Sequence, residues 1–219
     1  VLLQTSASNS VLAATSSGEC SCLNWKQSYT SGVVNCGDGF ELTDHELKTR
    51  RDVEYCHPWP GTNNTAFFLN QNHNYCVVAE ILKSTRPKEH PGYWCYVDAA
   101  CQDLNGGKAV NEKAAYKMCK PGSGEGLSDL PPGELFALSK RLAAEGAFMD
   151  SQMMVTMAYE WYGPEQFRGS IFDVPVPQNA SERPVLGTSN KFDTYALLYK
   201  NEVWETRDGP AGECIKGCQ

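Results

Sequence analysis

Apolar positions follow different patterns in the two halves of the chain. In the first half they come in short runs, of which 74–82 (NYCVVAEIL) and 92–99 (GYWCYVDA) are the clearest. Stretches rich in Gly, Pro and Asn, such as 57–64 and 103–108, separate these runs. Short apolar runs bounded by turn residues are typical of strands. We therefore expect a strand-and-loop unit over residues 20–120.

After residue 127 the apolar spacing changes to that of helices. Ser128 or Asp129 precedes two prolines, as at a helix start. Leu135, Leu138 and Leu142 then fall on one stripe, three and four residues apart. This spacing predicts a first helix with one buried face.

A second helix is predicted to begin at Asp150 or Ser151 and to end before Gly163 and Pro164. Four of its residues share the i, i+3, i+4, i+7 positions of one face, and these are Met154, Met157, Ala158 and Trp161. Because the two helices follow each other closely, we expect them to pack as a helical hairpin.

The remaining segments complete an α+β fold. Residues 1–19 resemble an extended Ser/Ala-rich tail, and 121–127 (PGSGEGL) a linker. A Pro-rich loop is expected at 164–187, and 195–206 (YALLYKNEVWET) predicts one strand or a hairpin. The expected domains are therefore the tail, a disulfide-rich unit at 20–120, and a unit at 121–219 with the helical hairpin and a short β element.

Composition and charge narrow the classes of partner. The chain has 219 residues, 41% of them hydrophobic, which is enough for a packed core, and no apolar run reaches the roughly 18 residues of a membrane span. It does not begin with Met, so we expect a mature form or a portion of the chain whose targeting segment has been removed. Its net charge of −7 lies mostly after residue 120. A surface of that sign repels phosphate backbones, which argues against nucleic acid and favours basic protein surfaces, although it also aids solubility.

Ten cysteines point to an oxidising compartment. Eight lie within residues 20–119 and two close the chain, and an even, clustered set is typical of a disulfide framework. Zinc and thioredoxin-like redox chemistry are alternatives, but paired Cys-x2-4-Cys units and a Cys-x-x-Cys motif are lacking. We expect disulfides, no metal and no cofactor at Cys20, Cys22, Cys36, Cys56, Cys76, Cys95, Cys101, Cys119, Cys214 and Cys218.

The methionines of the second helix allow three interpretations. Four of the five methionines lie at Met149, Met153, Met154 and Met157. Thioethers can fill a core, form an adaptable docking face or ligate Cu(I). We assign a partner-binding role to four residues of this helix, which are Met153, Met154, Met157 and Trp161.

No catalytic motif is evident. The four histidines lie near turns without an HExxH or nucleophile spacing, and dispersed carboxylates of a hydrolase would leave no signature. Aromatic and polar residues could form a sugar-stacking shelf, or the aromatics could pack over the disulfides instead. The residues concerned are Tyr93, Trp94, Tyr96, Asn70, Asn72 and Asp98.

Two resemblances to known families can be drawn. Residues 74–76 and 94–101 resemble parts of kringle and fibronectin type II modules, whose acidic ligand-binding pair has no counterpart here. Residues 19–120, from ECSCLNWK through WCYVDAACQDLNGG to YKMC, resemble a cysteine-rich module of dinoflagellate secreted and plastid-lumen proteins. Some of those proteins are accessory subunits of photosystem I supercomplexes, which implies the thylakoid lumen and no catalytic residues.

The leading hypothesis is therefore a non-catalytic peripheral subunit. It would dock onto a larger assembly, the resemblance implying the lumenal side of photosystem I. The alternative is an extracellular module that binds glycan or protein, and the third is a hydrolase with dispersed carboxylates. Of these, only the hydrolase would turn over a substrate.

Overall fold

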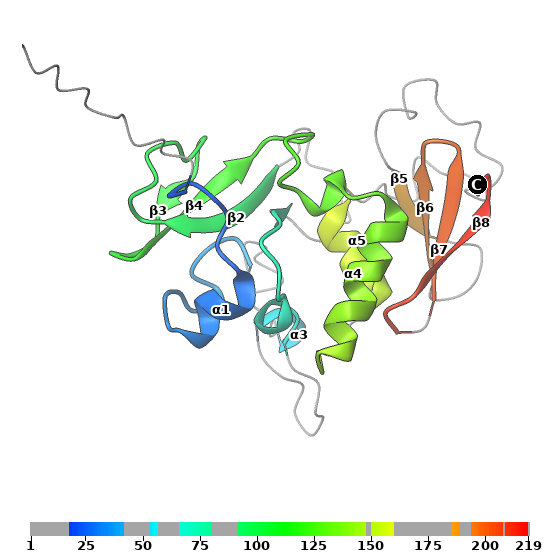
Figure 1. Ribbon diagram of the computed structural model, residues 1–219, viewed down its shortest axis with the longest axis horizontal. Coiled ribbons are helices and arrows are strands. Elements are labelled where there is room, and N and C mark those ends of the chain that lie inside the picture. The colour runs from blue at the N-terminus through cyan, green and yellow to red at the C-terminus, as the bar shows by residue number, and fades with distance from the viewer. Residues whose placement is uncertain are drawn as a thin grey trace, which may run out of the picture.

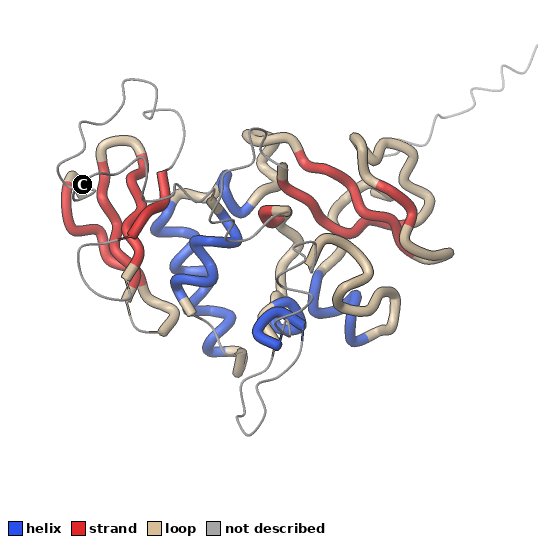
Figure 2. The backbone as a smooth tube through the Cα atoms, turned by 180° about the vertical axis from the view of Figure 1, so that it is seen from behind, coloured by secondary structure: helices blue, strands red, loops and turns tan. Residues whose placement is uncertain are grey.

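The structure is a computed structural model, and it describes residues 18–41, 53–56, 66–79, 92–147, 150–159, 185–188, 194–207 and 209–218. Two four-stranded antiparallel sheets lie at opposite ends of the molecule, and helices α4 and α5 lie between them (Figure 1). The view from behind shows the same order of strands, helices and strands (Figure 2). The predicted α+β, disulfide-rich fold is confirmed.

The first sheet has the strand order β1-β2-β4-β3. Its centre is the pair formed by β2 (Tyr93–Asp98) and β4 (Ala114–Cys119), in which Tyr93 faces Cys119 and Asp98 faces Ala114. The edge strands β1 (Val77–Val78) and β3 (Lys108–Ala109) have two residues each. The GYWCYVDA run is therefore a strand as predicted, whereas only two residues of the 74–82 run form one.

Both faces of β2 are buried. Residues directly opposite in an antiparallel pair point to the same face, so Cys95 shares one face with Lys117, and Trp94 shares the other with Met118. Five consecutive residues of the strand, from Tyr93 to Val97, are buried. A strand covered on both sides has no open aromatic shelf.

Short helices lie below this sheet in Figure 1. They are α1 (Trp25–Thr30), α3 (Val53–Cys56) and the 3-10 helix η1 (Phe68–Asn70). Asn24 begins α1 as its N-cap, because its side chain accepts a hydrogen bond from the Gln27 amide at 3.1 Å. The indole of Trp25 donates to the Tyr75 carbonyl at 2.8 Å, which ties α1 to the chain leading into β1.

The predicted linker at 121–127 is an ordered, anchored loop. The Cys76 amide donates to the Glu125 carbonyl at 2.7 Å, and the Leu127 amide donates to the Cys76 carbonyl at 2.9 Å. The Asp129 carboxylate accepts bonds from the amides of Gly122 and Gly124, both at 2.9 Å. The segment connects β4 to the helices, as the predicted linker would, and its backbone is held by the Asp129 carboxylate.

The first helix has the proline-led start that the sequence predicts, but neither Ser128 nor Asp129 caps it. Leu127–Asp129 forms the 3-10 helix η2, and α4 runs over Pro132–Ala144 with Pro131 as its N-cap. The predicted stripe is confirmed, since Leu135, Leu138 and Leu142 are all buried.

Helix α5 (Ser151–Ala158) packs against α4 and also contacts β1 and η2. The Asp150 side chain accepts from the Gln152 amide at 2.8 Å and caps the helix, as predicted. Burial includes Val155 and Thr156 as well as the predicted stripe, because neighbours enclose this helix on more than one side. The helix ends at Ala158, earlier than predicted, because Tyr159 is extended with φ −127° and ψ 149°. Residues 160–162 lie outside the described residues.

The second sheet joins consecutive strands in the order β5-β6-β7-β8. Of the two structures predicted for 195–206, one strand or a hairpin, the hairpin is the one found, with β6 (Tyr195–Tyr199) and β7 (Glu202–Thr206). Strand β5 (Val185–Thr188) begins inside the predicted Pro-rich loop, and β8 (Gly212–Lys216) forms the other edge.

One hydrophobic core crosses the predicted boundary at residue 120. It includes Val77 and Trp94 of the first sheet, Leu135 and Met154 of the helices, and Leu197 of the second sheet. Because these side chains belong to one buried cluster, the two predicted units share their core. Among the described residues, no helix combines the length and the apolar character that a membrane crossing requires.

Candidate functional site: a buried cluster of four cysteines

All ten cysteines form disulfides, and none is free. Four bridges lie in the first half of the chain and one in the second. Bridges of this number are typical of an oxidising or secreted environment. The pairs are Cys20–Cys101, Cys22–Cys95, Cys36–Cys56, Cys76–Cys119 and Cys214–Cys218.

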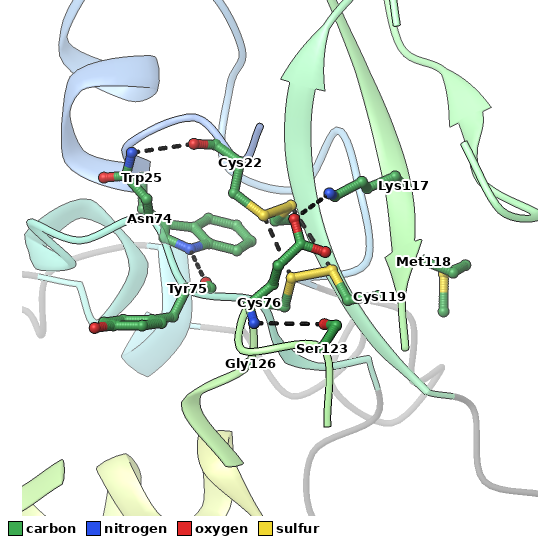
Figure 3. Close-up of a disulfide and its surroundings, with 12 residues drawn as sticks. Cys22, Trp25, Asn74, Tyr75, Cys76, Lys117, Met118, Cys119, Ser123 and Gly126 are labelled. Atoms are coloured by element: carbon green, nitrogen blue, oxygen red, sulfur yellow. Dashed lines mark hydrogen bonds and ion pairs between the residues drawn. A yellow bond between two sulfur atoms is a disulfide. The ribbon is translucent and has the colours of Figure 1, made fainter. Parts of the chain in front are cut away.

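Two of these bridges lie against each other in the core. The Sγ atoms of Cys22 and Cys76 are 3.3 Å apart, and those of Cys95 and Cys119 are 3.8 Å apart, although neither pair is bonded. All four sulfurs lie within 4.8 Å of one another. Figure 3 shows the two S–S bonds side by side. The four side chains are buried, so the sulfurs form one enclosed cluster.

Each cysteine of this cluster comes from a different element. Cys95 belongs to β2, and Cys119 is the last residue of β4. Cys22 precedes α1 and is held by the next residue, whose amide donates to the Tyr96 carbonyl at 2.7 Å. Cys76 precedes β1 and is held by the 125–127 loop. The cluster exists only because four distant segments meet at this point.

One cation lies beside the cluster. Lys117 is the cross-strand partner of Cys95, so both side chains project from the same face of the sheet. Lys117 is only 8% exposed, and its Nζ donates to Glu125 Oε1 at 2.5 Å. In Figure 3 its amine extends toward the two disulfides. The ammonium of Lys117 is paired with the Glu125 carboxylate, so the two charges largely offset each other beside the cluster.

Apart from the cysteine cluster, a set of buried polar groups lies around the Glu41 carboxyl. Its Oε1 accepts hydrogen bonds from the hydroxyls of Tyr29 at 2.8 Å and Tyr96 at 2.7 Å, and its Oε2 accepts from the Gly39 amide at 2.9 Å. Burial raises the pKa of Glu41 above its usual value, while these hydrogen bonds act in the opposite direction. Burial beside this carboxyl also raises the pKa of both phenols, so they remain donors.

His73 is the one histidine among the described residues, and it is structural. Its Nε2 lies 3.0 Å from Gln71 Oε1, and its Nδ1 accepts from the Tyr75 amide at 3.1 Å. Burial lowers the pKa of His73 to about 3, so the ring is neutral at physiological pH. Its two nitrogens are thus occupied within the fold. His45, His57 and His90 lie outside the described residues.

The predicted partner-binding face of α5 is buried inside this chain. Met154 and Met157 are 0% exposed, so in this structure they fill the core and contact no partner. The helical spacing of the sequence correctly placed both methionines on one apolar face. It could not show that this helix contacts α4, β1 and η2 of the same chain. Met153 is half-buried at the edge of the core. Trp161 and Met149 lie outside the described residues.

The predicted sugar-stacking shelf is absent from the described surface. Tyr93, Trp94 and Tyr96 are all buried, and Trp94 meets Trp25 edge to face with ring centroids 4.9 Å apart. These aromatic rings pack on one another in the core, and Trp94 and Tyr96 lie on the face of β2 opposite Cys95, so packing over the disulfides stays a prediction. Asn70 is buried and donates to a backbone carbonyl, while Asn72 and Asp98 are on the surface.

Sequence reasoning missed the four-cysteine cluster. The search for metal sites looked for close pairs of cysteines, and the members of this cluster are 19 or more residues apart: Cys22, Cys76, Cys95 and Cys119. The sequence did predict that Cys95 lies on a strand. It could not predict which cysteines lie beside Cys95 in space, because that depends on the order of the strands in the sheet.

Comparisons with family models, curated proteins and solved structures found no match for this chain. The functional argument therefore rests on the residues described above.

Proposed function

We propose that this chain is a non-catalytic structural protein of an oxidising compartment, which docks onto a larger assembly. The observation that carries the proposal concerns the buried ionisable side chains. The described Glu, His and Lys side chains of the core all have partners within the chain, and they are Glu41, His73, Lys117 and Glu205.

Internal pairing of this kind supports a structural role. A general acid or base has to reach the reacting atoms, and a metal-dependent enzyme has to leave a coordination position open. Glu41 accepts three hydrogen bonds, and both nitrogens of His73 are occupied. These groups stabilise the interior, which leaves the surface and the undescribed segments as the means of contact with other molecules.

The specific assembly that we propose is the lumenal side of photosystem I. Support comes from the resemblance of residues 19–120 to plastid-lumen modules and from the five disulfides, which a lumen permits. The acidic residues after 120 would face basic surfaces of the assembly, which attract them at long range.

Co-purification tests this proposal. A tagged full-length chain is added to detergent-solubilised thylakoid membranes, and photosystem I is isolated by sucrose gradient and native electrophoresis. We expect the tagged chain to migrate with photosystem I in a fixed ratio, and to be released as ionic strength rises.

A variant lacking residues 1–18 is the matched test of the tail. If the tail anchors the protein, the variant keeps its near-ultraviolet circular dichroism but no longer migrates with the complex. A chain that stays at the top of the gradient in every preparation would overturn the photosystem assignment. Turnover of glycan, ester or peptide substrates by the isolated protein would overturn the non-catalytic role itself.

A further inference from the structure

The four sulfurs of the cluster lie as close together as the ligands of one metal ion would, within 4.8 Å of one another. In a zinc site with four thiolates, Zn–S distances of about 2.3 Å place the sulfurs about 3.8 Å apart. Here two of the four unbonded sulfur pairs, Cys22 to Cys76 and Cys95 to Cys119, already measure 3.3 and 3.8 Å. Opening the two S–S bonds would let the bonded sulfurs separate to a similar distance. Only small side-chain movements are then needed, because no pair exceeds 4.8 Å.

We propose that Cys22, Cys76, Cys95 and Cys119 form a tetrathiolate site for one Zn²⁺ ion when their two disulfides are reduced. This inference is independent of the proposed docking function, and it departs from the sequence-based expectation of no metal. The other three bridges differ, since no second group of three or more candidate ligands occurs among the described residues. The four-cysteine cluster is therefore the place in the described chain where reduction creates a complete ligand set.

The chemistry balances with a dithiol as the reductant. Each disulfide accepts two electrons and two protons from one dithiol, which is itself oxidised to a disulfide, so two dithiols release four cysteine thiols. Zn²⁺ then replaces the four thiol protons and forms four Zn–S bonds. The resulting centre has a net charge of −2.

The surroundings suit such a centre. Structural zinc sites are closed to water, and all four cysteines are buried. The Lys117 ammonium lies on the same sheet face and is paired with Glu125 in the oxidised chain, so it could offset the negative charge only by leaving that carboxylate. The metal would also join the same four segments that the two disulfides join: the chain before α1, the chain before β1, strand β2 and strand β4. It would thus hold the reduced chain in its folded arrangement until the cysteines are oxidised.

The test uses the reduced full-length chain. The protein is reduced without oxygen by a phosphine, which is oxidised to the phosphine oxide, and is then titrated with Co²⁺ and with Zn²⁺ alone. We expect one equivalent of Co²⁺ to give the visible and thiolate charge-transfer bands of tetrahedral four-sulfur coordination, and Zn²⁺ to displace it. Metal addition should also restore near-ultraviolet circular dichroism from the aromatic residues around Trp94, which unfolded thiols binding metal at random would not do.

Two single variants provide the matched comparison. Cys95→Ser removes a ligand of the cluster, and Cys36→Ser removes a cysteine outside it; neither loses a bridge, since the chain is reduced throughout. We expect Cys95→Ser to bind Co²⁺ at least about tenfold more weakly and with a changed spectrum, and Cys36→Ser to match the parent. Equal losses in both variants, more than one bound ion without recovered structure, or no binding by the parent would each overturn the site.

Discussion

The sheet β1-β2-β4-β3 and the sheet β5-β6-β7-β8 each hold four antiparallel strands, but they bring those strands together over different distances along the chain. In the second sheet every strand pairs with its neighbour in sequence, and its one bridge spans 4 residues. In the first sheet the strand order is not sequential, and its surroundings are tied by bridges that span 81, 73, 43 and 20 residues.

This difference shows where covalent ties matter. The entropic cost of closing a loop grows with its length, so strands joined by short turns can hold their register through hydrogen bonds and packing. The edge strands of the first sheet have two residues each and contribute few hydrogen bonds. Long-range bridges compensate there by restricting the unfolded chain. The helices connect both regions, because α5 contacts β1 and Phe136 of α4 packs on Trp204 of β7.

The largest expected effect comes from breaking the core that the two regions share. Met157→Asp places an unpaired charge in a fully buried position of α5 and removes an apolar side chain. We expect a loss of about 4 kcal/mol or more in the free energy of unfolding, measured by urea denaturation.

Met153→Asp is the matched control, since it makes the same change on the same helix at a half-buried position in the first turn. A carboxylate near a helix N-terminus is favoured by the helix dipole, so we expect a cost of about 1 kcal/mol. Equal costs for the two variants would show that the α5 face is assigned incorrectly.

Removing one bridge from each region tests the comparison directly. The chain-entropy model gives about 4 kcal/mol for the 43-residue loop of Cys76–Cys119 and about 2 kcal/mol for the 4-residue loop of Cys214–Cys218. We expect the double variant Cys76→Ala/Cys119→Ala to unfold at markedly lower urea concentration than Cys214→Ala/Cys218→Ala. If Cys214→Ala/Cys218→Ala unfolds at the lower urea concentration, the long-range bridges are not the main covalent source of stability in the first region.

The difference between the regions also explains what the sequence could predict. Local signals were sufficient for β2, for the strands of the β6–β7 hairpin, for the start of α5 and for the buried faces of the two helices. The order β1-β2-β4-β3 was not accessible, because it depends on contacts between distant segments. For the same reason the sequence indicated that Cys22 and Cys95 are bridged but not to which partners, and it gave no sign that Cys76 and Cys119 lie beside them.

Burial was the other quantity that local patterns could not supply. The period of 3.6 residues placed Met154 and Met157 on one face, but it cannot tell a neighbouring helix of the same chain from a partner protein. Glu41 had no distinguishing feature in the sequence at all. Its partners Tyr29 and Tyr96 are 12 and 55 residues away.

Glu41 provides a pH test of the first region. Because burial raises its pKa, the folded state binds a proton that the unfolded state releases once the pH exceeds the usual value of 4.5. The stabilisation is complete below that pH and is lost as the pH rises through the raised pKa. Each unit by which the pKa of Glu41 is raised corresponds to about 1.4 kcal/mol of free energy of unfolding that is lost at high pH.

The variant Glu41→Gln cannot ionise, so it isolates this contribution. It also replaces the acceptor of the Gly39 amide, and for that reason the slope with pH is the measurement, not the stability at one pH. We expect the parent to lose stability relative to Glu41→Gln as the pH rises above 4.5 in urea denaturation. A constant difference over that range would mean that the pKa of Glu41 is not raised.

The smallest effect compares the helix caps of the two regions. The Asn24 side chain caps α1 next to the four-cysteine cluster, and the Asp150 side chain caps α5 without a nearby bridge. Replacing an N-cap residue by Ala costs about 1 kcal/mol where the helix end is free to fray.

Asn24→Ser retains an acceptor for the cap but loses the bond from the Asn24 amide to Asn72, so it separates the cap from that contact. We expect Asn24→Ala and Asp150→Ala to cost about the same, and Asn24→Ser to recover most of the loss, because a disulfide restricts the unfolded chain without satisfying the amides at a helix start. A negligible cost for Asn24→Ala beside a normal cost for Asp150→Ala would show instead that the bridge at Cys22 holds α1 in place on its own.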